Sequence, residues 1–441
     1  MSGRTVISIL ALAAALGPAA AAARADRTVP HEVVVGFKPR DAQMAQAASA
    51  RGTGPAARVR VLRVKNVAAA IRRLRRQRNV AYAVPNVVAR MTDFRLPNDP
   101  GRTGQPGGWE QVQWNFVGPF GINASAAWAH VFAAGHVGAD NVTIAVLDTG
   151  VAYSNRRGFV RSPDLGGTRF VRGYDFVAHS PYPFDRNGHG THVASTLAET
   201  TDNGIALTGL AYRARIMPVR VLDAHGEGDA TTIAAGIRFA VKRHAKIINL
   251  SLEFSTDVTA REIPQLLSAI AFAHKHGVLL VGASGNEAHG SIAYPARAAD
   301  VVSVGATTEH GCLSDFSNDG RGLDLVAPGG GADAQLPGDP ACHPLDPPGH
   351  DIFQMTFSGA SLRRFGLPSG YEGTSMAAPH VSGTAALIIA SGVLGANPTP
   401  NAILRRMELT ARDLGPPGYD TRYGFGLIDA GRATDPAVPV S

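Results

Sequence analysis

The sequence lacks the features that would place it among fibrous, disordered or repeat proteins. Its 50 glycines follow no period, and hydrophobic residues make up 45% of the chain against 17% charged residues. These values exclude a collagen-like chain and an intrinsically disordered one. There is no internal repeat, and beyond the N-terminal segment no stretch approaches 18 uninterrupted apolar residues, so the mature protein is expected to be soluble. What remains is a loop-rich globular protein with a large core.

Cysteine is also scarce, because Cys312 and Cys342 are the only two. Neither lies in a context typical of a catalytic thiol. In an exported chain an even pair is usually oxidised, and a bond between these two would tether residues 329–371. Two separate thiols are the alternative.

Basic charge is concentrated in one segment. Lysine and arginine outnumber aspartate and glutamate by 15 to 4 in residues 26–95, whereas in residues 96–441 they are outnumbered by 31 to 25. The two segments therefore carry +11 and −6, and their opposite charges favour association. A nucleic-acid surface is the alternative for the arginine-rich run at residues 72–78. No aromatic residue is interleaved with that run, so we expect no nucleic-acid partner.

The first 25 residues have the order of a secretory signal peptide. Arg4 gives a charged start, residues 6–16 are apolar, and an alanine-rich stretch ends at Ala25. The apolar run is too short to span a bilayer. We expect export to the exterior or the periplasm, with an N-terminal anchor as the alternative.

Hydrophobic periodicity predicts two folded parts. Residues 26–95 read as a small α+β unit, with strands over residues 31–38 and 80–86 and a basic amphipathic helix over residues 67–77. From residue 96 onward apolar strands alternate with helices, which indicates an α/β fold with a mostly parallel sheet buried on both faces. The strands are expected at residues 143–147, 215–222, 246–250, 278–281 and 301–304, and the helices at residues 191–197, 231–243, 260–276 and 374–390.

Three polar residues suit nucleophilic catalysis. Ser375 lies among small residues at the start of a predicted helix, where its hydroxyl has little steric cover. His189 stands between two glycines and would take a proton from a hydroxyl. Asp148 ends the strand at residues 143–147 and would fix the tautomer of a histidine. Each motif alone is typical of a turn or a helix start, so the inference depends on all three.

The chain order Asp148, His189, Ser375 and the motifs around these residues resemble the subtilisin-like serine proteases, the subtilase family or peptidase S8. The likeness runs from about residue 98 to residue 430. It implies a subtilisin-like three-layer catalytic domain at residues 96–434, a short tail at 435–441 and an inhibitor-like propeptide at 26–95 that covers the active site and assists folding.

The resemblance also implies the function. We expect a secreted serine endopeptidase that acts on polypeptides through an acyl-enzyme and is made as a self-processing zymogen. The maturation site is expected between residues 88 and 108, and the mature enzyme is expected to be a monomer with no membrane attachment. Asn286 is implied to offer its side-chain amide to the oxyanion of the reaction, together with the backbone N–H of Ser375.

Substrate and metal residues are implied by the same likeness. The substrate-binding set is Ser251, Leu252, Glu253, Ala283, Ser284 and Gly285, of which the first segment pairs with substrate backbone. The family commonly continues with glycines where this chain has Glu253 and Phe254. With Glu287 nearby, this departure leaves open a preference for basic side chains. A Ca²⁺ ion is implied at a set of oxygen ligands, namely Asp164, Asn203, Ile205 and Leu207, although an insertion at residues 152–162 precedes the first of them.

Two other functions compete with proteolysis. The first is a protease-like scaffold that binds polypeptides without turnover. The second is a serine esterase of the α/β-hydrolase type, which predicts a Gly-X-Ser-X-Gly motif and the order Ser, Asp, His. Residues 373–377 fail the first requirement, and the chain order fails the second. His189 disfavours an acid-acting relative with a carboxylate base.

Overall fold

The computed structural model describes residues 28–38, 58–87, 94–156 and 158–439. Its contacts divide the chain into two units between Asp93 and Phe94, and each unit is described by itself. The predicted signal peptide lies outside the described residues. Within the part of the chain that is described, no helix is both long and apolar enough to cross a membrane.

The first unit combines an antiparallel sheet with one helix. Its described elements are β1 (Thr28–Phe37), β2 (Arg58–Arg63), α3 (Val67–Arg75) and β3 (Val80–Val87), and the strand order is β2-β1-β3. Val33 and Val35 point from β1 to the same face of the sheet and pack against Ala70 and Leu74 of α3. The α+β expectation is confirmed, although β2 was not predicted.

The second unit is built on a parallel sheet. Its strands lie in the order β11 (Leu325–Pro328), β10 (Val301–Thr307), β9 (Leu279–Ala283), β8 (Ile247–Leu250), β4 (Thr143–Asp148), β7 (Arg215–Arg220) and β5 (Arg169–Phe170), and β6 (Tyr174–Asp175) pairs with β7. Each of these strand pairs is parallel. The five predicted strands all lie in this sheet, which confirms the α/β expectation.

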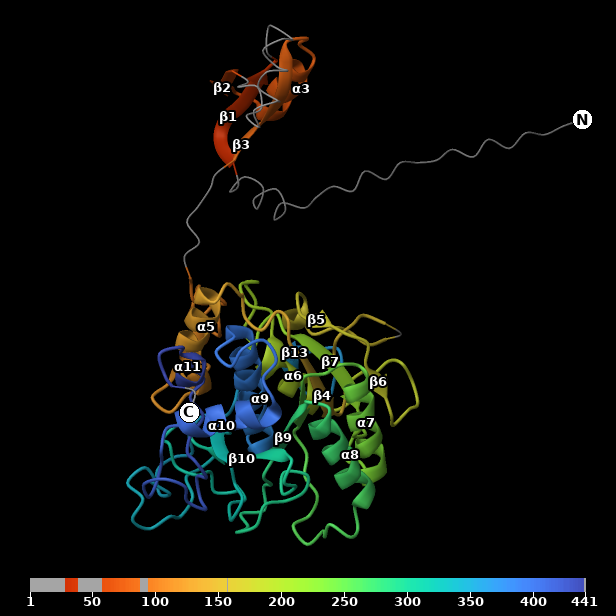
Figure 1. The fold of residues 1–441 in the computed structure, drawn as a ribbon, viewed down its shortest axis with the longest axis vertical. Coiled ribbons are helices and arrows are strands. Elements are labelled where there is room, and N and C mark those ends of the chain that lie inside the picture. Colours follow the sequence, from red (N-terminus) through yellow and green to blue (C-terminus); the bar gives the residue numbers. More distant parts are fainter. Residues whose placement is uncertain (1–27, 39–57, 88–93, 157, 440–441) are drawn as a thin grey trace, which may run out of the picture. The chain divides into compact units, whose positions relative to one another are not determined.

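Helices cover both faces of the sheet (Figure 1). One face packs against α7 (Ala230–Lys242) and α8 (Pro264–Lys275), and the other against α6 (His189–Ala198) and α9 (Thr374–Ser391). Successive side chains of β4 point to opposite faces of the sheet. Ile144 and Val146 pack on the α9 side, and Ala145 and Leu147 pack on the α7 side. The fold is therefore the three-layer arrangement expected from the sequence.

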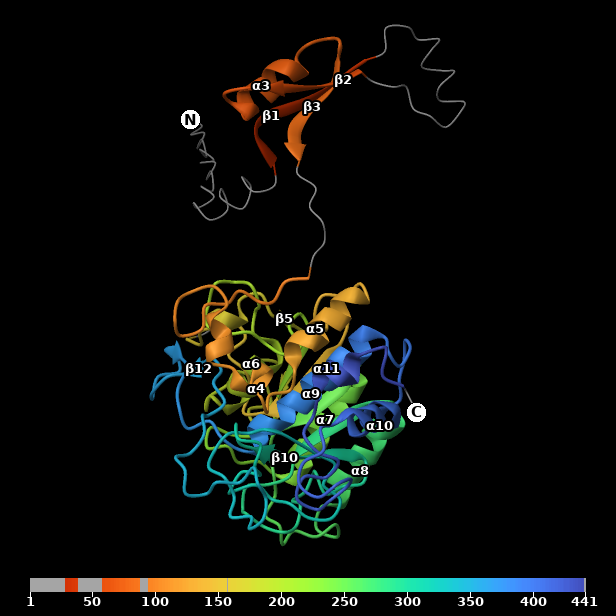
Figure 2. The same ribbon diagram turned by 90° about the vertical axis from the view of Figure 1, so that its left-hand side faces the viewer.

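Further helices thicken the layer on the α9 side. Figure 2 shows α9 with α5 (Ala124–Ala133) and α11 (Ala430–Thr434) beside it, and α10 (Pro400–Thr410) also contacts α9. The shorter elements are η1 (Gly108–Gln111), α4 (Trp114–Val117), η2 (Pro163–Leu165), β12 (Thr356–Phe357) and β13 (Phe365–Gly366). Near the end of the unit, Leu427 forms isolated bridges to Val326 and Arg412.

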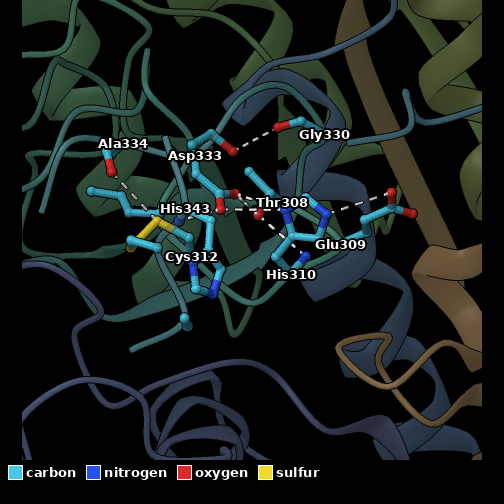
Figure 3. A network of polar contacts seen from close by, with 12 residues as sticks. Thr308, Glu309, His310, Cys312, Gly330, Asp333, Ala334 and His343 are labelled. Atoms are coloured by element: carbon cyan, nitrogen blue, oxygen red, sulfur yellow. Dashed lines mark hydrogen bonds and ion pairs between the residues drawn. A yellow bond between two sulfur atoms is a disulfide. The ribbon is translucent and has the colours of Figure 1, made fainter. Parts of the chain in front are cut away.

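A disulfide joins Cys312 to Cys342, with 4.9 Å between the Cα atoms, so the predicted oxidised pair is confirmed. The bond fixes the long segment before α9 to the residues that follow β10. Asp333 reinforces this attachment, because its buried carboxylate accepts hydrogen bonds from the Thr308 hydroxyl at 2.6 Å and the His343 backbone N–H at 2.8 Å (Figure 3).

Candidate active site

The Asp148 carboxylate is fixed at the carboxyl end of β4. Its side chain is fully buried and accepts a hydrogen bond from the Thr149 backbone N–H at 2.7 Å. A Cβ atom on Gly190 would lie 2.9 Å from Oδ1 of Asp148 and 2.2 Å from the carbonyl oxygen of Gly150. Glycine at position 190 therefore lets the first turn of α6 approach the end of β4 closely.

His189 is the first residue of α6 and lies beside this carboxylate. Its Nδ1 atom is 2.8 Å from Oδ1 and 3.0 Å from Oδ2 of Asp148. This contact favours the tautomer with hydrogen on Nδ1, which leaves the Nε2 lone pair available to accept a proton. Burial lowers the pKa of the imidazole, but the charge and hydrogen bond of Asp148, with a contribution from Asp185, raise it more, so the pKa lies above its ordinary 6.5.

Ser375 is the second residue of α9 and is partly exposed. In this structure its hydroxyl donates to the carbonyl oxygen of Ser251 at 3.3 Å, and its own carbonyl accepts from the Ser251 hydroxyl at 2.7 Å. Ser375 and His189 line one cavity of about 700 Å³. The structure thus brings the predicted nucleophile and base to the same cavity, with Asp148 buried behind the base.

Asn286 follows β9 and is held from two sides. Its Oδ1 atom accepts hydrogen bonds from the Thr374 backbone N–H at 2.8 Å and the Thr374 hydroxyl at 3.1 Å. Its Nδ2 atom donates to Oε1 of Glu253 at 3.1 Å. Because donors lie on one side of the amide and an acceptor on the other, its orientation is fixed. Asn286 is exposed, and its contact with Thr374 places it beside the start of α9, where Ser375 lies.

Comparisons with known proteins agree with this geometry. A family model described as Subtilase family matches residues 139–426, about two thirds of the chain. The chain belongs to the subtilase family. It is a serine-type endopeptidase, and it carries a prodomain, since the model described as Fervidolysin N-terminal prodomain matches residues 15–86. That match begins inside the predicted signal peptide.

Individual relatives give the same result. A thermophilic serine proteinase from Bacillus sp. (strain AK1) is 33% identical over 371 residues, which cover 84% of this chain and 76% of the relative. Subtilisin Savinase from Lederbergia lenta is 38% identical over 298 residues, which cover 66% of this chain and 90% of the relative. A solved protease structure from Pseudoalteromonas arctica PAMC 21717 superposes with a TM-score of 0.61 at 29% identity, covering 77% of this chain and 99% of that one.

The residues expected to bind substrate separate into two groups in this subtilase. Ser251, Leu252 and Glu253 line the cavity with His189 and Ser375. The other three, Ala283, Ser284 and Gly285, are buried and do not line it; the Ser284 hydroxyl donates to the carbonyl oxygen of Asn318. The side chains of Ala283 and Ser284 are therefore packed inside the protein, just before Asn286, and do not face the cavity.

Several cavity residues were not anticipated. They lie just after β4, in the turn before α6, in the loop between β7 and α7, and near the start of α7. In that order they are Thr149; Asn187; Leu222, His225 and Glu227; and Ile233. The polar, glycine-containing stretch after β7 was a usable signal, because loops at the carboxyl ends of parallel strands gather at one edge of the sheet.

Two histidines near the site, His192 and His380, are buried and hydrogen-bonded within the fold. His192 is buried, stacks on Tyr371 with ring centroids 4.2 Å apart, and lies 2.8 Å from the carbonyl oxygen of Ile352. His380 is buried within α9 beside Asn115. Burial lowers the pKa of His192 to about 3 and that of His380 to about 4, so both are neutral in the folded enzyme near pH 7.

The residues expected to bind calcium do lie together. Asp164 is fully buried and accepts hydrogen bonds from the Asn203 amide at 2.7 Å and the Leu207 backbone N–H at 3.1 Å. The backbone N–H of Ile205 donates to Oδ1 of Asn203 at 2.7 Å. Asp99, which was not predicted, joins the group by accepting from the backbone N–H groups of residues 202 and 203.

The residues around Asp164 offer the kinds of oxygen atom that bind a hard cation. Two buried carboxylates, an amide oxygen and backbone carbonyls are the oxygen ligands that Ca²⁺ takes. In this structure, however, the Asp164 carboxylate accepts hydrogen bonds from N–H groups, and the described residues contain no group of three or more His, Cys, Asp or Glu side chains placed to hold a metal. Burial raises the pKa of Asp164 to about 7.

Proposed function

We propose that this subtilase cleaves peptide bonds with Ser375 as nucleophile and His189 as general base. The observation that carries the proposal is the pairing of His189 Nδ1 with buried Asp148 at 2.8 Å, on the wall of a cavity that Ser375 also lines. His189 Nε2 takes the Ser375 proton as its oxygen attacks the carbonyl carbon, and the imidazolium that forms is stabilised by the Asp148 carboxylate. His189 then donates the proton to the departing amine, which leaves an acyl-enzyme that water hydrolyses.

Asn286 is the proposed side-chain donor to the oxyanion. Its amide has two hydrogens, and the contact with Glu253 uses one of them. The second is available to the carbonyl oxygen as negative charge develops there. Because Thr374 and Glu253 fix the amide before substrate arrives, little reorganisation is needed during the reaction.

The basic first unit is the proposed inhibitor and folding aid of the enzyme. Residues 26–95 carry +11 against −6 for residues 96–441, which favours their association, and the prodomain match covers most of this segment. We further propose export through the segment at residues 1–25 and self-cleavage of the zymogen between residues 88 and 108.

A calcium ion is proposed at Asp164 and Asp99, with the loop at residues 203–207 turning its Asn203 and backbone oxygens toward the ion. Such an ion would neutralise carboxylates that otherwise lie buried without a cation. It would stabilise the loop and takes no part in the chemical steps.

Replacement of the nucleophile tests the proposed function. The Ser375→Ala variant is expected to accumulate as a precursor that still contains residues 26–95 when expressed in a host lacking other proteases, and to hydrolyse no peptide above background. Mass spectrometry of the purified chain and a fluorogenic peptide assay measure both. Normal trimming of this variant would show that cleavage occurs in trans, and retained hydrolysis would refute the role of Ser375.

A further inference from the structure

Glu253 occupies an unusual place beside the reacting groups. Its carboxylate accepts the backbone N–H of Asn286 on Oε2 at 2.8 Å and the side-chain amide of Asn286 on Oε1 at 3.1 Å. A Cβ atom on Gly285 would lie 2.6 Å from Oε2. The side chain therefore extends from the cavity-lining segment 251–253 to the segment that carries the proposed oxyanion donor.

The Glu253 carboxylate is partly desolvated by the surrounding protein but has unused hydrogen-bonding capacity. Glu253 is exposed and lines the same cavity as His189 and Ser375. An ionised carboxylate has about four lone-pair sites, and Asn286 uses two of them. Further donors can therefore bind to Glu253 while it still holds Asn286.

The charge on this wall of the cavity is negative. Within the described ranges no lysine, arginine or histidine forms an ion pair with Glu253. Glu227 lines the same cavity, and Glu287 lies close enough to raise the pKa of Glu253 further, in addition to the larger effect of partial burial. The other titratable side chains that line this cavity are His189 and His225.

We propose that Glu253 makes this subtilase select a lysine or arginine side chain immediately before the scissile bond. The inference rests on the proposed function, because it places the scissile carbonyl between Ser375 and Asn286. Glu253 holds the Asn286 amide and lines the cavity with Ser375, so its carboxylate lies within reach of a long side chain on the residue whose carbonyl those two groups would bind. A guanidinium or ammonium group donates to the free lone pairs of Glu253 and supplies the missing positive charge.

A pair of isosteric substrates tests the selectivity. The mature enzyme, obtained from the full chain, is assayed with internally quenched peptides that differ only in the residue before the scissile bond: arginine, citrulline, leucine or glutamate. Citrulline keeps the shape of arginine without its charge. The expected kcat/KM for arginine exceeds that for citrulline by about ten-fold, the size of a close charge pair, and the ratio falls as salt rises.

The Glu253→Gln variant assigns this ratio to one carboxylate. The arginine-to-citrulline ratio is expected to fall close to 1, while the matched control Glu287→Gln retains most of it. Any change in the Asn286 amide affects both peptides alike and cancels in the ratio. A Glu253→Gln enzyme that keeps the wild-type ratio would overturn the assignment.

The outcomes separate this inference from the proposed function. Equal cleavage of the arginine and citrulline peptides by the wild-type enzyme would end the selectivity proposal while leaving the protease proposal intact. Failure to cleave any of the four peptides would refute both. Because the wild-type ratio and its salt dependence need no variant, the test does not depend on how Glu253→Gln folds.

Discussion

Asp148 and Asp164 are both fully buried carboxylates of the second unit, yet their partners differ. Asp148 contacts an imidazole, His189, which lines the same cavity as Ser375. Asp164 contacts N–H donors from residues 203 and 207 and lies near two more buried carboxylates, Asp99 and Glu199. In the first site the negative charge acts on a titratable base. In the second it has no base to act on and no cationic partner in the described residues.

The comparison shows that burial by itself does not identify a catalytic carboxylate. Burial raises the pKa of Asp164 to about 7, a shift of the size that active sites display. The pKa of His189 also rises, but from contact with a charge and against the effect of burial. A partner that can exchange protons with substrate distinguishes the proposed catalytic site at Asp148 from the site at Asp164.

Replacing Asp148 or Asp164 by asparagine removes a negative charge from each site, and the effects on kcat should differ more than in any other comparison. Asp148→Asn is expected to lower kcat by about 10³–10⁴-fold, because it favours the wrong tautomer of His189 and leaves the imidazolium without its counter-charge. Asp164→Asn, the matched control, should leave kcat within a few-fold of wild type. Steady-state kinetics with one peptide measures both variants, and similar losses in the two would abolish the distinction.

The two sites also each contain an asparagine, which allows a second comparison. Asn286→Ala should lower kcat by about 10²–10³-fold with a smaller change in KM, because the lost donor acts on charge that develops in the transition state. Asn203→Ala should affect thermal stability and leave kcat nearly unchanged. An Asn286→Ala enzyme with wild-type kcat would show that the oxyanion is stabilised by other groups.

The pH dependence of kcat/KM tests whether the pKa of His189 is raised, as its contact with Asp148 predicts. The base must be neutral to accept the Ser375 proton, and its pKa lies above 6.5. The kcat/KM of the mature enzyme should therefore fall about ten-fold per pH unit below a midpoint that itself lies above pH 6.5. A midpoint well below 6.5 would mean that Asp148 does not outweigh the effect of burial.

The contribution of Asp164 to the free energy of unfolding should decrease as pH rises, whereas that of a carboxylate in an ion pair increases. The folded-state pKa of about 7 lies above the ordinary 3.8, so the folded protein retains a proton that the unfolded chain has lost. The stabilisation is complete below pH 3.8 and disappears as pH rises to 7. Added Ca²⁺ is then expected to raise the melting temperature on the order of 5 °C at pH 8 and little at pH 5. Asp164→Asn should abolish the Ca²⁺ shift; an equal shift in that variant would place the ion elsewhere.

The sheet was predictable from the sequence because its signals are local. The apolar runs that became β4, β7, β8, β9 and β10 are continuous, as strands buried on both faces require. The strand β2 was missed although arginine alternates with apolar residues along it, which is a usable local signal of a strand with one exposed face.

The site was predictable where family motifs cover it and less so where contacts are long-range. Asp148, His189 and Ser375 lie in extended motifs, and the structure brings the first two into contact. Asp99 contacts the backbone of residues 202–203, which lie over a hundred positions away in the sequence. No local sequence pattern predicts this contact. The contact between Glu253 and Asn286, 33 positions apart, likewise has no local sequence signal.

Covalent labelling tests the central claim most directly. The mature enzyme is treated with a fluorophosphonate probe, and the labelled peptide is identified by mass spectrometry in the wild type and in Asp148→Asn. The account predicts that the label is attached to Ser375, at a rate that falls steeply in the variant. A label on another residue, or active hydrolysis with Ser375 unmodified, would contradict it.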